Sequence, residues 1–165
     1  MAKNTTVSEY IENIRDLIDQ DFVISNVSVP EYDYVYEANE SKFLADQVLY
    51  LCIKGQTRIT EEEFVAAKDA VNSKIESERS TSRIPGVDLV KNRDYPHIIN
   101  IAVTDKILKE TEEYTETEWD FDGQGYVNEQ IVVGLENEEV IFNKKMLQRH
   151  TESEQIVDDY LEKAF

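Results

Sequence analysis

The hydrophobic pattern of the central part of the chain predicts two helices that meet at Gly55. Between residues 41 and 54, apolar side chains recur at three- and four-residue spacing, which is the period of a helix. Further apolar residues widen this stripe around most of the helix, so the first helix should be almost surrounded by protein. Glycine suits a helix C-cap, and a second amphipathic helix is expected over residues 60–78. Cys52, inside the first apolar run, is predicted to be a small core residue.

Capping signals predict where three of the helices begin. A threonine followed three residues later by a glutamate forms a capping box, in which each side chain accepts a hydrogen bond from the other residue's backbone N–H. Such pairs predict helices over residues 6–21, 60–78 and 151–165, and the segment 22–24 is expected to carry the chain into the core. The three pairs are Thr6 and Glu9, Thr60 and Glu63, and Thr151 and Glu154.

A further long helix is predicted over residues 94–113. Asp94 suits the N-cap, and Pro96 falls in the first turn, where its missing N–H costs nothing. A buried strand over residues 98–103 is the competing interpretation, because short apolar runs are ambiguous. His97 near the helix start is expected to be either a surface residue or a histidine with its hydrogen bonds satisfied.

Three tyrosines alternate with Asp33, Val35 and Glu37 and predict a strand with aromatic rings on one face. They are Tyr32, Tyr34 and Tyr36, and Pro30 just before them indicates an edge strand or two short pieces. Such a row could stack nucleic-acid bases, but the acidic residues around it disfavour that use. A half-buried face, or a contact patch for a protein partner, is the preferred interpretation.

An acidic hairpin is predicted after residue 110. No lysine or arginine occurs between residues 110 and 143, whereas eleven acids do. Period-two alternation over residues 115–121 and 127–135, around a glycine-containing turn, indicates two paired strands, with a third at 139–142. The carboxylates assigned to its free face are Glu116, Glu118, Asp120 and Asp122.

These elements predict one α+β domain over residues 1–165, with about four amphipathic helices packed on a small antiparallel sheet that includes the acidic hairpin. A chain of this length buries enough surface to fold without a metal or a disulfide. The C-terminal helix at 151–165 ends in Phe165, whose apolar side chain should dock on the domain or on a partner.

The net charge of −18 changes the list of plausible partners. It argues against broad contact with DNA, RNA or anionic membranes, because their phosphates would repel the surface. It is compatible with simple solubility, with a basic protein partner, or with imitation of a nucleic acid. With no signal region and no run of roughly 18 apolar residues, we expect a soluble protein that is intracellular during its synthesis.

A long loop over residues 79–94 is locally basic in this acidic chain. Its cations are Arg79, Arg83, Lys91 and Arg93. One interpretation is a solvated linker whose cations bridge to the acidic surface. The other is an arm that docks on an acidic surface of a neighbouring copy, since long loops in compact domains are often functional.

Motifs for catalysis and cofactors are incomplete. Residues 120–127 resemble the opening of an EF-hand calcium loop, but the position of the bidentate acid holds Ile131. A hairpin turn is therefore preferred over a calcium site. One cysteine and two distant histidines do not build a zinc site, and neither a phosphate-binding glycine loop nor a nucleophile elbow is present. We expect no cofactor and no enzymatic activity.

The separated basic and acidic surfaces predict a non-enzymatic structural protein, a subunit of a larger assembly. Charge-complementary patches can pair head to tail, with copies of the chain or with neighbouring subunits. In size and composition the chain resembles small phage proteins of the head–tail connector or other virion accessories, and that resemblance implies a place in a virion. The alternative is an acidic nucleic-acid mimic that inhibits a host DNA-binding defence enzyme, of the anti-restriction or anti-CRISPR type.

Overall fold

The computed structural model describes residues 5–27, 29–38, 49–81, 97–111, 119–121, 127–142 and 154–165. The N-terminal elements are α1 (Val7–Ile18), β1 (Phe22–Ile24), β2 (Tyr34–Ala38), β3 (Leu49–Gly55) and α2 (Glu61–Thr81). They are followed by β4 (His97–Thr104), β5 (Trp119–Phe121), β6 (Val127–Gly134) and β7 (Glu139–Phe142). A C-terminal helical segment over residues 154–164 includes a π-helical turn (Val157–Leu161) and a 3-10 turn (Glu162–Ala164).

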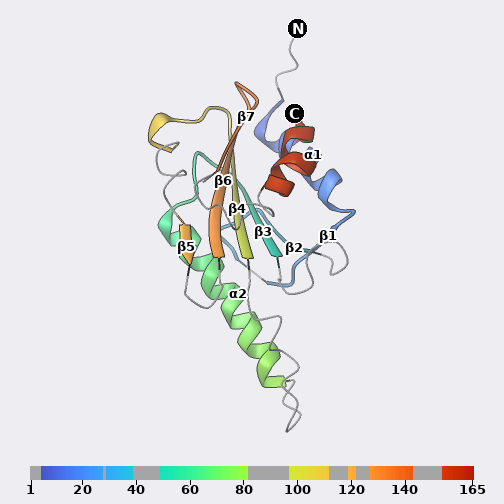
Figure 1. The fold of residues 1–165 in the computed structure, drawn as a ribbon, viewed down its shortest axis with the longest axis vertical. Coiled ribbons are helices and arrows are strands. Elements are labelled where there is room, and N and C mark those ends of the chain that lie inside the picture. The colour runs from blue at the N-terminus through green and yellow to red at the C-terminus, as the bar shows by residue number, and fades with distance from the viewer. Residues whose placement is uncertain are drawn as a thin grey trace.

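The seven strands of the described residues form one mixed sheet in the order β1-β2-β3-β4-β6-β5, and β7 also pairs with β6 (Figure 1). The central pairs β3–β4 and β4–β6 are parallel, whereas the other neighbours are antiparallel. β5 lies against residues 127–129 of β6 and β7 against residues 131–134. The two short strands therefore share one side of β6.

Helices cover both faces of this sheet. On one face, α1 and the C-terminal helical segment pack on a core that includes Leu51, Ile101 and Val133. On the other face, α2 packs over a second core that includes Tyr50, Cys52 and Ala102. Because side chains alternate between the faces of a strand, a strand covered on both sides must be apolar throughout much of its length.

Two helix predictions are wrong: the first of the two central helices over residues 49–55, and the helix predicted over 94–113 across residues 97–104. Residues 49–55 form β3 and residues 97–104 form β4, as the competing strand interpretation of 98–103 proposed. Every residue of β4 is buried. In a continuous apolar run, some apolar residues always fall at helical spacing. Periodicity therefore does not distinguish a buried strand from a buried helix. Of these two predicted helices, residues 41–48, 94–96 and 112–113 lie outside the described residues.

The predicted fold class is therefore corrected: a mixed sheet covered on both faces replaces four helices on a small antiparallel sheet. The helices beginning near Thr6 and Thr60 are confirmed, as are the hairpin of β5 and β6 and the added strand β7. Glu129 and Gln130 in β6 are both buried, so this strand does not present a free acidic face.

Within the described residues, no helix combines the length and the apolar character that crossing a membrane requires.

Candidate functional site

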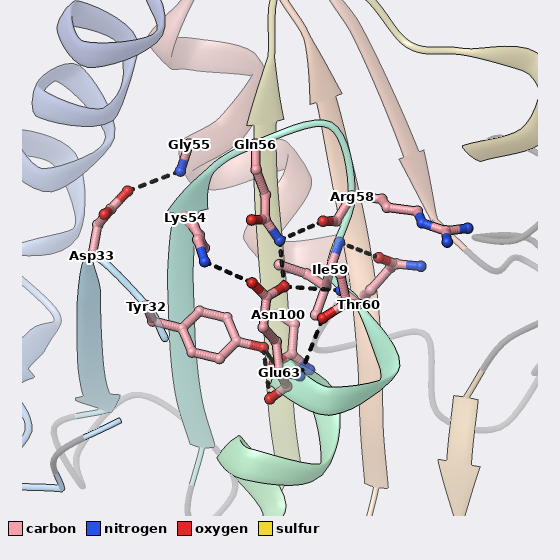
Figure 2. A network of polar contacts seen from close by, with 11 residues as sticks. Tyr32, Asp33, Lys54, Gly55, Gln56, Arg58, Ile59, Thr60, Glu63 and Asn100 are labelled. Atoms are coloured by element: carbon pink, nitrogen blue, oxygen red, sulfur yellow. Dashed lines mark hydrogen bonds and ion pairs between the residues drawn. The ribbon is translucent and has the colours of Figure 1, made fainter. Parts of the chain in front are cut away.

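A cluster of polar side chains lies where α2 begins, on one face of the sheet (Figure 2). We call it the α2 junction, and its members are Tyr32, Lys54, Gln56, Thr60, Glu63, Asn100 and Asn128. Thr60 and Glu63 start the helix with the capping box that the sequence predicts. The Thr60 backbone N–H donates to Glu63 Oε2 over 2.9 Å, and the Glu63 N–H donates to Thr60 Oγ1 over 3.3 Å. Because first-turn N–H groups lack acceptors within the helix, this exchange fixes where α2 begins.

The Glu63 carboxylate is also the centre of a charge-compensated cluster. Lys54 Nζ, from the end of β3, lies 2.6 Å from Glu63 Oε1. The Gln56 side-chain amide donates to Glu63 Oε2 and to the backbone carbonyl of Arg58. Burial raises the pKa of Glu63, but the hydrogen bonds from Lys54, Thr60 and Gln56 outweigh it and hold the pKa below the ordinary value of 4.5.

Beneath this cluster, a chain of buried side-chain amides joins the sheet to α2. The Tyr32 hydroxyl donates to Asn100 Oδ1 over 2.5 Å. Asn100 Nδ2 donates to Asn128 Oδ1 over 2.5 Å and to the Glu129 carbonyl over 2.9 Å. Asn128 Nδ2 donates to the Phe64 carbonyl in the first turn of α2 over 3.0 Å. Asn100 and Asn128 are fully buried, so these bonds satisfy groups that water cannot reach.

Two more bonds position the connection between β3 and α2. Asp33 Oδ2, just before β2, accepts from the Gly55 N–H over 2.9 Å. Gln130 Oε1, on β6, accepts from the Ile59 N–H over 3.1 Å. The α2 junction thus holds the crossover from β3 to β4 against two other parts of the fold, strand β6 and the residues just before β2. Among the described residues, no group of three or more His, Cys, Asp and Glu side chains could hold a metal ion.

We expect the Glu63→Gln variant to be less stable than the wild type by about 1–2 kcal/mol at pH 7, because the charge-assisted bonds to Lys54 and Gln56 are weakened. The pKa of Glu63 is lower in the folded chain than in the unfolded chain. Its stabilising contribution is therefore complete above the unfolded value of 4.5 and is lost as the pH falls through the folded-state pKa. Urea unfolding of both proteins at pH 3 to 7 measures the difference in unfolding free energy. For a small protein this free energy falls by about 1–3 kcal/mol per molar urea.

The matched control is Glu62→Gln, which changes an exposed glutamate in the same helical turn. It should alter the free energy of unfolding by less than about 0.5 kcal/mol. A difference between Glu63→Gln and wild type that stays constant across the pH range would contradict the role assigned to the ionised carboxylate.

On the opposite face of the sheet, two further polar side chains are buried together. His97 Nε2 lies 3.4 Å from Glu129 Oε2, at the first residue of β4 and the third of β6. His97 is therefore a buried histidine facing a carboxylate rather than a surface residue. Its neighbour could not be found from the sequence, because the two residues meet only through the parallel pairing of β4 and β6.

The three tyrosines proposed as a partner contact do not share one face. Tyr36 is buried in the core beneath α1 and Tyr34 is half-buried beside it, whereas Tyr32 is buried beneath α2. Arg15 of α1 covers the pair: its Nε donates to the Tyr36 hydroxyl over 2.9 Å, and its guanidinium lies 4.0 Å from the Tyr34 ring centre. β2 lies between β1 and β3, contrary to the edge position predicted.

The charged residues proposed as partner contacts are mostly outside the described part of the chain. Arg79 lies within α2, which continues to Thr81, rather than in a loop. Asp120 lies in β5, and its side chain is not described. A partner contact through these residues therefore stays a prediction. The residues outside the described ranges are Arg83, Lys91, Arg93, Glu116, Glu118 and Asp122.

Phe165 packs on its own domain. Its ring centre lies 5.1 Å from that of Tyr10 in α1, and the Tyr10 hydroxyl donates to the Leu161 carbonyl over 2.5 Å. Cys52 is buried as predicted, and burial raises the pKa of its thiol to about 12. The thiol is therefore protonated and enclosed in the folded chain.

An exposed apolar pair on β1 was missed by the sequence analysis. Phe22 enters the core as expected, but Val23 and Ile24 remain 51% and 66% exposed. β1 is the last strand of the sheet on its side, with β2 as its neighbour among the described strands. The sequence held no signal for this, because an apolar pair beside a buried phenylalanine is equally typical of a core strand.

No protein-family model, curated protein or solved structure matches this chain.

Proposed function

We propose that this chain is a non-enzymatic interaction protein, a subunit of a larger assembly whose neighbours are copies of itself or other subunits. The observation that supports this most directly is the exposed apolar pair, Val23 and Ile24, on the edge strand β1. Edge strands that expose apolar side chains tend to pair with other chains, and proteins usually shorten, charge or cover them. Here the edge is short, but the two side chains are neither charged nor covered by described residues.

The chemistry of the α2 junction supports the non-enzymatic part of this proposal. Lys54 and Glu63 neutralise each other, and the amides of Asn100 and Asn128 bond to each other and to backbone carbonyls. Buried networks of this kind, when their groups are paired, rigidify a core and specify its packing. We therefore assign this cluster to holding α2 on the sheet.

The net charge of −18 favours a basic surface on the partner. In the sequence, basic residues occur within the chain itself, in the stretch of residues 79–94. A contact between that stretch of one copy and an acidic surface of the next is heterologous, so repeated contacts close into a ring or extend into a filament. A head–tail connector or another virion component is an assembly of this class.

Solution mass tests the proposal. We expect light scattering to find a discrete oligomer at about 50 mM salt that dissociates as the salt approaches about 1 M, because exposed charges are screened over shorter distances. The variant Arg83→Glu with Lys91→Glu should lower the mass at low salt. Lys106→Glu with Lys163→Glu, which reverses two exposed lysines elsewhere, is the matched charge control.

A mass of one chain at every salt and protein concentration would contradict self-assembly. The alternative proposal, an acidic nucleic-acid mimic, would then take precedence. It is favoured by the exposed carboxylates of Glu61, Glu62 and Asp69 along the 21-residue helix α2. Its test is competition with duplex DNA for a basic DNA-binding enzyme, and mimicry predicts that the chain displaces DNA.

A further inference from the structure

The backbone of β1 presents hydrogen-bonding groups away from the sheet. The Ser25 N–H donates to the Val35 carbonyl over 2.9 Å, which places the Ser25 backbone toward β2. Along an antiparallel strand, successive residues point their N–H and C=O groups alternately toward one neighbour and the other. Val23, paired with Glu37, therefore also faces β2, whereas the N–H and C=O of Ile24 point outward.

The side chains of β1 are arranged so that a neighbouring strand would cover apolar surface on both sides of the sheet. Phe22 anchors β1 in the core, with its ring centre 5.8 Å from that of Tyr160. Ile24 lies on the same face as Phe22 and is 66% exposed, whereas Val23 lies on the face of α2 and is 51% exposed. A strand laid along β1 would bond to Ile24 and bury part of each exposed side chain.

The charge beside β1 indicates which kind of strand would bind. Asp19 and Asp21 precede it directly, and Asp19 is exposed. Asp21 accepts a hydrogen bond from the Tyr160 hydroxyl over 2.5 Å, so its carboxylate is held close to the start of the strand. In a chain of net charge −18, an extended segment with lysine or arginine near these two carboxylates gains attraction, and an acidic one is repelled.

We propose that the edge of β1 binds an extended, basic segment of a neighbouring protein by strand addition. The segment contributes backbone hydrogen bonds to Ile24, apolar side chains against Val23 and Ile24, and lysine or arginine beside Asp19 and Asp21. In strand addition, backbone bonds supply affinity and alternate side chains supply specificity. This inference rests on the proposed interaction function and names the surface and the chemistry of its partner.

The competing occupant is a second copy of the chain, whose own β1 would pair with this strand. It would bring together two chains that each carry a charge of −18, over a strand of only three residues. Raising the salt would strengthen such a contact by screening the repulsion, whereas it weakens the contact of an acidic surface with a basic segment. Salt dependence therefore separates the two occupants.

The experiment measures fluorescence anisotropy of a labelled peptide, Thr-Val-Thr-Val-Thr-Lys-Thr-Lys, titrated with the full chain. We expect saturable binding that weakens with salt, and no binding of the peptide in which glutamate replaces lysine. Ile24→Pro should weaken binding at least tenfold, because proline removes the outward N–H. Proline is tolerated on edge strands, and the N–H that it removes is not directed at β2.

Two controls separate loss of the edge from loss of the fold. Ile24→Thr keeps the N–H but reduces the apolar surface, so it should weaken binding only a few-fold. If Ile24→Pro also lowers the urea midpoint of unfolding, a peptide with N-methylated valines removes the donors from the partner and leaves the protein unchanged. That peptide should then bind at least tenfold more weakly to the wild-type chain.

Three results would overturn the inference. Equal binding to wild type and Ile24→Pro, with N-methylation also without effect, would mean that charge alone attracts the peptide. Equal binding of the lysine and glutamate peptides would reject the basic partner. Self-association that rises with salt and disappears in Ile24→Pro, without peptide binding, would make the occupant a second copy.

These failures are distinguishable from failure of the proposed function. A chain that forms a discrete oligomer in light scattering but ignores the peptide keeps its assembly role and uses another surface. A chain that stays monomeric but binds the peptide through Ile24 loses self-assembly and retains the strand-addition surface.

Discussion

Replacing Asn100 with leucine should lower the free energy of unfolding by about 3 kcal/mol, because it removes the central member of a buried polar chain. Asn100 is fully buried and accepts from Tyr32 while donating to Asn128 and to the Glu129 carbonyl. Leucine has the same branched shape and a larger side chain, so the substitution creates no cavity. The cost comes from polar groups of three neighbours that lose a partner where water cannot replace it. Urea unfolding at pH 7 provides the measurement.

A double-mutant cycle with Tyr32→Phe isolates the pairwise contribution. The single Tyr32→Phe change removes a hydroxyl and leaves Asn100 Oδ1 without that donor. In the double variant both partners are apolar, so the combined loss should be smaller than the sum by about 1 kcal/mol. Strict additivity, or a loss below about 0.5 kcal/mol for Asn100→Leu, would show that the bonds between these side chains do not stabilise the fold.

Replacing Leu161 with alanine should also destabilise the chain by about 3 kcal/mol, within the range of about 2–5 kcal/mol for large-to-small changes in a core. Leu161 belongs to the C-terminal helical segment and is fully buried in the core that this segment forms with α1 and the sheet. Its carbonyl also accepts the hydrogen bond of Tyr10, so loosening the segment weakens a second contact. Thermal and urea unfolding, followed by circular dichroism, measure the loss.

Lys163→Ala is the matched control in the same segment. Its side chain is 62% exposed and lies 3.9 Å from Asp159, so the ion pair is a solvent-exposed one. Such pairs contribute little, and the free energy of unfolding should change by less than about 0.5 kcal/mol. If Leu161→Ala and Lys163→Ala behaved alike, the C-terminal segment would not be part of the cooperative core.

The residues tested above fall into two groups: those that stabilise the fold and those that bind a partner. The α2 junction and the C-terminal segment lie inside the fold, so their variants should change the unfolding energy and leave peptide binding by folded protein intact. Ile24 lies on an exposed edge, so its variants should change peptide binding and leave the unfolding energy nearly unchanged. If an Ile24 variant mainly destabilised the fold, Ile24 would belong with the residues that stabilise the chain.

The features that depend on residues close together along the chain could be predicted from the sequence. The capping boxes of Thr6–Glu9 and Thr60–Glu63 form because each joins residues three apart, whatever the rest of the fold does. The antiparallel pairing of β5 and β6 follows from period-two alternation on either side of a glycine-containing stretch of sequence. The burial of Cys52 also follows from its apolar surroundings, although it lies in a strand and not in the predicted helix.

Long-range contacts decide whether the long apolar runs are helices or strands, and which strand lies at the edge of the sheet. β3 and β4 are apolar on both sides because helices cover both faces of the sheet, and that covering is set by segments far away in the chain. The amide pair of Asn100 and Asn128 likewise forms only once β4 and β6 lie side by side. Val23 and Ile24 are exposed for the same reason: strand order, a property of long-range pairing, leaves β1 at the end of the sheet.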